Sequence, residues 1–287
     1  MDVSQKFLPI ATTSIFPKCP DVLAHYTNQH GIIGILKSSE IWATIIRFLN
    51  DSNERQYGLS LALDILRQRI ENKIYSHLSL AHLEMFKEEL SRRGGSNICV
   101  CSWSENDDTL SQWRGYSKGS QGYAFCLSGS DLREIATSQN FWLGKCIYDY
   151  KTHAEIITEI LDSCINSARH GTPPKPSDLA ERITNWMLLV APFIKDPGFA
   201  EEKEWRLVST ILPSDHANFS VRPGKSFPIP YYRFSLKKHG GPTQFWINVG
   251  PGNNKELASD GLHFLFDRSE LKWSSMGSSR IPLRSEL

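Results

Sequence analysis

The sequence predicts an α+β fold with one split sheet, mixed or antiparallel, and with helices inserted between its strands. Short apolar segments with alternating side chains recur along the 287 residues and indicate strands. Longer segments between them place apolar residues at helical spacing. Neither side of the break GTPPKPS at 171–177 looks complete alone, which favours one domain with interleaved strands and helices.

The expected elements follow the chain from these two patterns. Apolar runs predict strands at 22–27, 41–46, 97–104, 121–127, 145–150, 204–211, 229–235, 245–249 and 262–266. Helical spacing predicts a short helix capped by Thr27 or Asn28, and further helices around 59–70, 83–90, 110–116, 157–168 and 179–190.

The domain organisation follows from these elements. Residues 1–21 look like an irregular lead-in, and residues 22–287 are expected to form a single domain with a helical insertion near 151–195. The break at 171–177 is interpreted as a loop between two helices rather than as a linker.

Composition limits the class of protein. Hydrophobic residues make up 40% and charged residues 22%, as in ordinary globular proteins, and a formal net charge of +1 gives no strong general attraction to nucleic acid or membrane. No apolar run approaches the roughly 20 residues that span a bilayer, and the N-terminus lacks a signal-peptide pattern. The six cysteines show no CxxC pair, so we expect buried thiols in a cytoplasmic protein.

The segment LAHYTNQHGIIGIL places three polar-tipped side chains at the end of an apolar strand. Alternation puts His25 and Thr27 on one face and Tyr26 on the other, directly before a helix N-terminus that favours an anion. His25 is either a hydrogen-bonded core residue or a ligand-binding residue.

Three other segments supply polar candidates. Asn50 and Asp51 in RFLNDSNE are typical of a turn and helix cap, with ligand binding as the alternative. Arg114 follows Trp113 in SQWRGY, which indicates either a surface stack or a phosphate contact.

The third segment with polar candidates is the expected strand EWRLVSTI at 204–211. It places Glu204 and Arg206 on one face. A glutamate in a buried strand is costly unless it is paired or used, so Glu204 is either the partner of Arg206 or a catalytic carboxylate.

Several common motifs do not occur. The sequence has no GxxxxGK[ST], HExxH or GxSxG, and His77 and His82 are five residues apart, so no metal site is inferred.

Seven blocks together resemble a bacterial domain-of-unknown-function family over roughly residues 22–284. The blocks are HYT at 25–27, LKSSEIWAT at 36–44, FLNDSNE at 48–54, CSWSENDDTLSQWRGY at 101–116, QGYAF at 121–125, EKEWRLV at 202–208 and INVGP at 247–251. The opening also resembles the start of ADP-ribosyltransferase folds, in particular the branch that modifies DNA bases.

This second resemblance implies an ADP-ribosyltransferase-like fold with NAD as substrate. By chain order it assigns His25 to the adenosine ribose, Tyr123 to the nicotinamide and Glu204 to the nicotinamide ribose. Glu204 departs from the usual motif, because Lys203 and Glu202 precede it where an ExE or QxE partner would stand. A carboxylate beneath that ribose would stabilise the positive charge that develops when the N-glycosidic bond breaks.

The remaining polar candidates would complete the nucleotide site. Arg114 and Arg206 are catalytic candidates beside Glu204, and one of them or Arg47 would hold the pyrophosphate. Tyr26, Thr27, Asn50 and Trp113 would bind the nucleotide in the same pocket.

Three functions remain open at this point. The first is an NAD-using transferase or glycohydrolase, a toxin or anti-phage effector that modifies a protein or nucleic acid. The second is a module that binds a nucleotide or single-stranded nucleic acid, with bases stacked on Trp42, Trp103, Trp113, Tyr123 and Trp205. The third is a nuclease with Asp51, Glu54 and Glu204 around a metal. The sequence does not indicate the oligomeric state.

Overall fold

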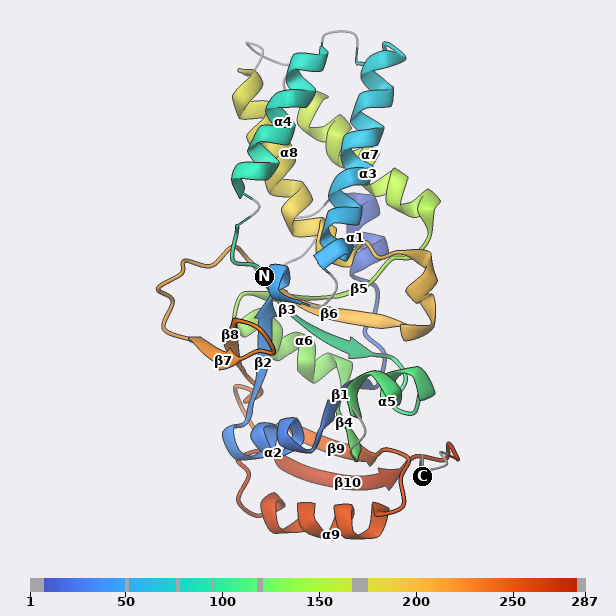
Figure 1. Cartoon of the computed structure of the whole chain (residues 1–287), viewed down its shortest axis with the longest axis vertical. Coiled ribbons are helices and arrows are strands. Elements are labelled where there is room, and N and C mark those ends of the chain that lie inside the picture. The colour runs from blue at the N-terminus through green and yellow to red at the C-terminus, as the bar shows by residue number, and fades with distance from the viewer. Residues whose placement is uncertain are drawn as a thin grey trace.

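The computed structural model is an α+β structure with a mixed, largely antiparallel open sheet, as predicted. It describes residues 8–49, 52–75, 78–93, 95–117, 121–166 and 175–282. The molecule is elongated, with a helical bundle at one end and strands β9 and β10 with helix α9 at the other (Figure 1).

Ten strands form the sheet in the described residues. They are β1 (Leu23–Asn28), β2 (Glu40–Ile45), β3 (Cys99–Ser104), β4 (Gly122–Leu127), β5 (Phe141–Lys145), β6 (Glu204–Ser209), β7 (Phe219–Pro223), β8 (Pro228–Ser235), β9 (Gln244–Val249) and β10 (Lys272–Ser278). The main path runs β10-β9-β4-β1-β3-β2-β8-β7, and β6 joins β3 to β5.

The sheet branches at β3. One edge of β3 pairs with β6 from Val100 to Ser104, so β1 and β2 share the opposite edge. Ser104 near the end of β3 pairs with Ala24 of β1, whereas Val100 and Cys99 pair with Thr44 and Ile45 of β2. The strands therefore diverge into two wings, one through β4 and β9 and one through β8 and β7.

The register defines two faces of the sheet, because paired residues in antiparallel strands point to the same side. The inner face carries Leu23, Phe125 and Trp205 and packs under three helices, α2 (Gln29–Ser38), α6 (Gly129–Ser138) and α9 (Lys255–Phe266). The outer face carries Ala24 and Tyr26, which pack against Trp113 of helix α5 (Leu110–Ser117).

The helical bundle covers another part of the outer face. It contains α3 (Ser52–Glu71), α4 (Leu80–Arg93), α7 (Tyr150–Asn166) and α8 (Pro176–Val190), and its core includes Val100 and Val208 of the sheet. The bundle thus draws on two chain segments. The sequence predicted helices in both, but it described only the region near 151–195 as a helical insertion.

Four local expectations differ from the structure. Residues 9–15 form helix α1, which begins at Pro9 and buries Ala11 and Ile15, in place of an irregular lead-in. Strand β5 ends at Lys145, so 145–150 is not a strand. The run at 262–266 is the end of α9 and not a strand, because Leu262 and Phe266 are buried one turn apart. Strands β7 and β10 were not predicted, because none of their residues is buried and they carry no apolar alternation.

The expectation of buried thiols is confirmed for five of the six cysteines. All six are free, and Cys99, Cys101, Cys126, Cys146 and Cys164 are buried. None of the helices in the described part of the chain has both the length and the apolar character that crossing a membrane requires.

Asn28, at the end of β1, is the N-terminal cap of helix α2, one of the two residues expected there. The Asn28 side chain accepts a hydrogen bond from the Gly31 N–H at 3.0 Å. We expect Asn28→Ala to lower the free energy of unfolding by about 1 kcal/mol, because one N–H of the first turn loses its acceptor. Urea unfolding measures the change, and Asn28→Asp, which keeps an oxygen there, should retain most of the stability. Equal losses in both variants would contradict the capping role.

Candidate functional site

A small pocket opens on the outer face of the sheet beside the branch point of β3. Strands β1, β3 and β6, helix α5 and the short helix η4 (Pro197–Glu202) all contribute to it. Its lining residues are Ala24, Tyr26, Ser102, Trp103, Ser104, Gln112, Tyr116, Glu202 and Glu204.

Glu204 is the central charged group of this pocket. It lies at the start of β6, opposite Ser104, and is 4% exposed. Arg206, on the same face, donates from Nε to Oε1 at 2.8 Å and from Nη2 to Oε2 at 3.0 Å. This bidentate arrangement matches the planar guanidinium to the carboxylate.

Lys195 is the second cation on Glu204. Its Nζ lies 2.7 Å from Glu204 Oε2 and also contacts the carboxylate of Glu202. Lys195 follows the short helix η3 (Ala191–Phe193) and is 3% exposed. Two carboxylates therefore face two cations. Lys195, Glu202, Glu204 and Arg206 together form the ion cluster.

The charge state of Glu204 follows from its neighbours. Burial alone would raise the pKa of Glu204, but Arg206 and then Lys195 lower it to about 2. Glu204 is therefore ionised at neutral pH. Burial, helped by the negative charges of Glu204 and Glu202, raises the pKa of Tyr116 to about 12, so that phenol is protonated.

Tyr26 fixes the side of the pocket formed by α5. Its hydroxyl donates to the Asn106 carbonyl at 2.8 Å and accepts from the Thr109 N–H at 3.0 Å. Its ring packs edge-on against Trp113. These contacts hold the loop before α5, and α5 in turn presents Gln112 and Tyr116 to the pocket.

The structure separates the predicted residues of β1. Tyr26 lines the pocket with Glu204, but His25 and Thr27 lie on the inner face, because their cross-strand partners Phe125 and Tyr123 point there. His25 Nδ1 lies 2.9 Å from the Ser102 carbonyl oxygen, and burial lowers its pKa. Tyr123 is buried in the inner core.

The other predicted residues are dispersed. Arg206 belongs to the ion cluster and Trp113 packs behind Tyr26, whereas Arg114 is solvent-exposed and is not a lining residue. Arg47 is also exposed, and its guanidinium donates to Gly95 and Asn97. Asn50 and Asp51 lie outside the described residues, as does the side chain of Glu54.

Sequence reasoning did not identify Lys195, Glu202, Gln112 and Tyr116 as site residues. A partial signal existed for Gln112 and Tyr116, because they are four residues apart on the predicted helix and so share one of its faces. Lys195 had no such signal, because it follows a helix that was interpreted only as core. Within the described ranges, no group of three or more His, Cys, Asp or Glu side chains is arranged to hold a metal ion.

Comparison with known proteins gives one match. Residues 112–207, from α5 to β6, match the family described as Protein of unknown function (DUF2971). This confirms the predicted resemblance to a domain-of-unknown-function family, and the matched segment contains Gln112, Tyr116 and the whole ion cluster. The chain matches no curated protein and no solved structure.

The ion cluster predicts a large stability effect at Glu204. We expect Glu204→Gln to lower the free energy of unfolding by about 3–5 kcal/mol, because Arg206 and Lys195 stay buried after losing a shared anion. Chemical denaturation measures it. Glu201→Gln, at the exposed neighbour on η4, should change stability by less than about 0.5 kcal/mol. A stable Glu204→Gln protein would contradict the role of the cluster.

The pKa of Glu204 also predicts a pH dependence. Its folded pKa of about 2 lies below the unfolded value of about 4.3, so its stabilisation is complete above about pH 5 and is lost as pH falls toward 2. The corresponding loss is about 3 kcal/mol over this window. Unfolding measured between pH 5 and pH 2 should show a shallower decline in Glu204→Gln than in the wild-type protein, and parallel declines would exclude this assignment.

Proposed function

We propose that the outer-face pocket cleaves NAD in an ADP-ribosyltransferase or NAD glycohydrolase reaction. Part of the pocket lies within residues 112–207, the segment that matches the DUF2971 family. The observation that carries the proposal is Glu204, a buried carboxylate that lines a pocket and is ionised at neutral pH. An anion that the protein holds in place and shields from water stabilises a developing positive charge more strongly than one in bulk water.

The reaction requires a cation to form at the ribose. The bond between the ribose C1′ and the nicotinamide nitrogen breaks, and its electron pair leaves with nicotinamide. Glu204 stabilises the resulting ribosyl cation. An acceptor nucleophile, or water in the hydrolytic case, then forms a bond to C1′ and loses its proton.

Lys195 has a specific part in this proposal. In the structure both Arg206 and Lys195 neutralise Glu204, which weakens the field that the carboxylate exerts on a substrate. Lys195 also contacts Glu202, so it retains an anionic partner if substrate displaces it from Glu204. Arg206 keeps the carboxylate ionised and oriented throughout.

The remaining polar groups suit the sugar and the ring of the substrate. Ser102 and Gln112 offer hydrogen-bonding groups for ribose hydroxyls, and the Tyr116 ring offers an aromatic surface. The Ser104 hydroxyl instead holds the wall of the pocket, because it donates to the Glu202 carbonyl and accepts from the Asn106 N–H. Tyr26, rather than His25, shares the outer face with Glu204. It forms a wall of the pocket, while its hydroxyl stays bonded to the Asn106 carbonyl and the Thr109 N–H. The acceptor, a toxin or anti-phage role and a cytoplasmic location remain proposals of the same kind.

A matched pair on α5 tests the proposal without disturbing the ion cluster. Gln112 lines the pocket, and its neighbour Ser111 is exposed. We expect the wild-type protein to release nicotinamide from NAD, measured by chromatography with and without a cell extract as the source of acceptor. Gln112→Ala should reduce this at least about tenfold, the effect of losing one preorganised polar group, and Ser111→Ala should not.

The other outcomes separate the alternatives. NAD binding measured by calorimetry, without nicotinamide release in either condition, would identify a nucleotide-binding module instead. Metal-dependent cleavage of nucleic acid without NAD would identify a nuclease. Equal nicotinamide release by Gln112→Ala and the wild-type protein would place the reaction outside this pocket.

A further inference from the structure

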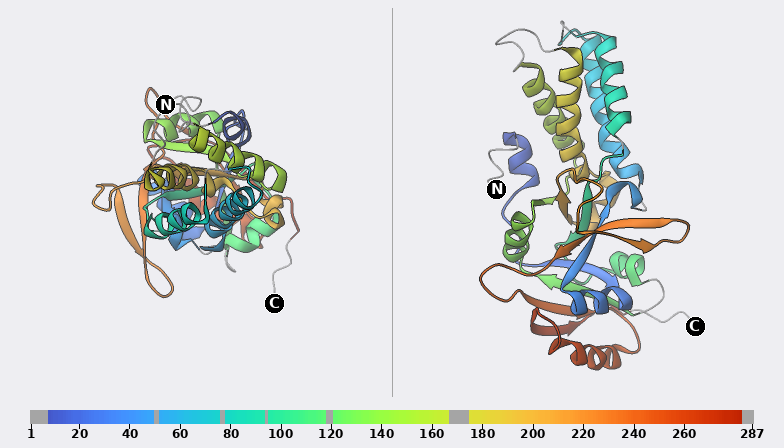
Figure 2. Two further views of the ribbon diagram at one scale, coloured as in Figure 1. Left: turned by 90° about the horizontal axis from the view of Figure 1, so that it is seen from above. Right: turned by 90° about the vertical axis from the view of Figure 1, so that its left-hand side faces the viewer.

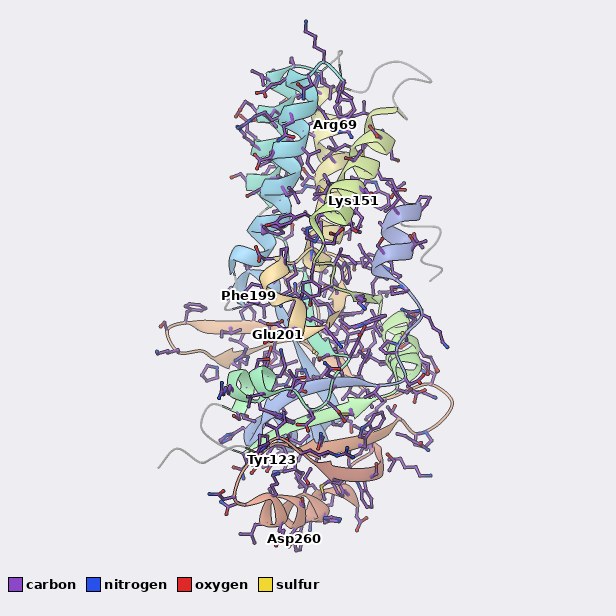
Figure 3. All side chains as sticks on the ribbon, turned by 90° about the vertical axis from the view of Figure 1, so that its right-hand side faces the viewer. Arg69, Tyr123, Lys151, Phe199, Glu201 and Asp260 are labelled. Atoms are coloured by element: carbon purple, nitrogen blue, oxygen red, sulfur yellow. The ribbon has the colours of Figure 1, made fainter. Side chains whose placement is uncertain are left out.

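The wing formed by β2, β8 and β7 leaves part of the outer face exposed. Thr44 of β2 pairs with Val100 of β3, which alternates with Ser102, so Trp42 and Thr44 share the outer face with the pocket. Helix α5 and the β7–β8 hairpin project from the same side of the molecule (Figures 2 and 3). In Figure 3, Phe199 and Glu201 mark η4 near the level of this hairpin.

An aromatic pair lies at the centre of this surface. Trp42 stacks on Tyr231, with ring centroids 4.4 Å apart and ring planes 28° apart. Tyr231 is 7% exposed, whereas Trp42 is 48% exposed and presents a large flat ring to solvent. Tyr231 thus supports Trp42 from one side and fixes its orientation.

Cations flank this pair on the same face. Arg233 is the direct cross-strand partner of Trp42 and is exposed. Arg222 pairs with Ile229, two residues from Tyr231 on the same face, and its buried Nε has no hydrogen-bond partner among the residues that the structure describes. Residues 219–235 contain Arg222, Lys225 and Arg233 and no carboxylate, whereas Glu40 lies on this face at the far end, opposite Ser235.

We propose that Trp42, with Tyr231, Arg222 and Arg233, binds single-stranded nucleic acid. An exposed flat ring between guanidinium groups matches a base beside its phosphates, because every base can stack and every phosphate is an anion. A carbohydrate would use the ring but not the positive charge, and an acidic peptide would use the charge but not the flat ring. The inference does not require the pocket to cleave NAD.

Exposure to solvent distinguishes Trp42 from the other aromatic residues that were predicted to stack on bases. Trp103, Trp113, Trp205 and Tyr123 are buried, so the prediction that they stack bases is wrong. Of the five aromatic residues in that prediction, only Trp42 presents its ring to solvent in the structure. A duplex keeps its bases within the helix and therefore cannot use this ring in the same way.

Fluorescence anisotropy with a labelled 20-nucleotide single strand of mixed sequence tests this surface. We expect the wild-type protein to bind the single strand more tightly than the matching duplex. Trp42→Ala should weaken binding by a factor on the order of ten or more. Trp273→Ala is the matched control, because Trp273 is a 38% exposed tryptophan on β10, and it should bind like the wild-type protein.

The arginines provide a second, independent measurement. Arg222→Ala and Arg233→Ala should each weaken binding and reduce the slope of log affinity against log salt concentration by about 0.7, the value for one phosphate contact with a single strand. Arg92→Ala, at an exposed arginine on α4, is the control. Circular dichroism confirms that each variant is folded.

Four outcomes would overturn the inference. They are no binding by the wild-type protein at about 0.1 M salt, equal affinity for duplex and single strand, an unchanged affinity in Trp42→Ala, and displacement of the oligonucleotide by polyglutamate at equal charge. The last would show a general anion-binding surface for acidic peptides. Nicotinamide release from NAD, present or absent, bears only on the pocket and leaves this result unaffected.

Discussion

The ion cluster of Lys195, Glu202, Glu204 and Arg206 is the interaction on which the site depends. A single buried charge would be expensive, but here each charge has an opposite partner within hydrogen-bonding distance.

The cluster also connects two layers of the fold. Arg206 on β6 donates to the carbonyl of Pro192 at 2.7 Å, and Lys195 follows the same η3 segment, so the end of the helical bundle is fixed to the sheet through polar contacts rather than through apolar packing alone. A substrate that displaced Lys195 would therefore loosen a connection between layers as well as a single ion pair.

The branching of the sheet at β3 places this cluster beside a pocket. Because β1 and β2 share one edge of β3, the outer face near Ser102 and Ser104 is not covered by a continuous layer of helices. The bundle covers the face at Val100 and Val208, and α5 covers it at Tyr26. The pocket lies between the bundle and α5, and its polar groups come from β1, β3, β6, α5 and η4. Polar side chains at such a position keep partial access to solvent, which a continuous core would deny them.

Features set by neighbouring residues in the sequence could be predicted, whereas features set by the pairing of distant segments could not. Alternation along EWRLVS correctly placed Glu204 and Arg206 together, because side-chain period along a strand is local. The same rule separated Tyr26 from His25 and Thr27, but which of them meets Glu204 depends on the register of β1 with β3, and no local pattern specifies it. Lys195 reaches Glu204 only through the turn after η3. The run at 262–266 was misread because a short apolar segment fits a strand and a helix end equally well.

Net charge also proves a poor guide to the electrostatics of this chain. The formal charge of +1 excluded a general attraction to nucleic acid, yet the outer face contains two regions of different character. In the ion cluster the charges of two cations and two carboxylates balance, so a ligand would enter the pocket by its shape and hydrogen-bonding groups rather than by net charge. On the β2–β8–β7 wing, Arg222 and Arg233 flank an exposed ring without a carboxylate in the hairpin to neutralise them. Screening confines such fields to roughly 8–10 Å at physiological salt, so the local arrangement and not the sum decides which anions bind to the surface. The two proposed sites, a pocket with balanced charges and a cationic surface, would therefore bind different ligands without competing for them.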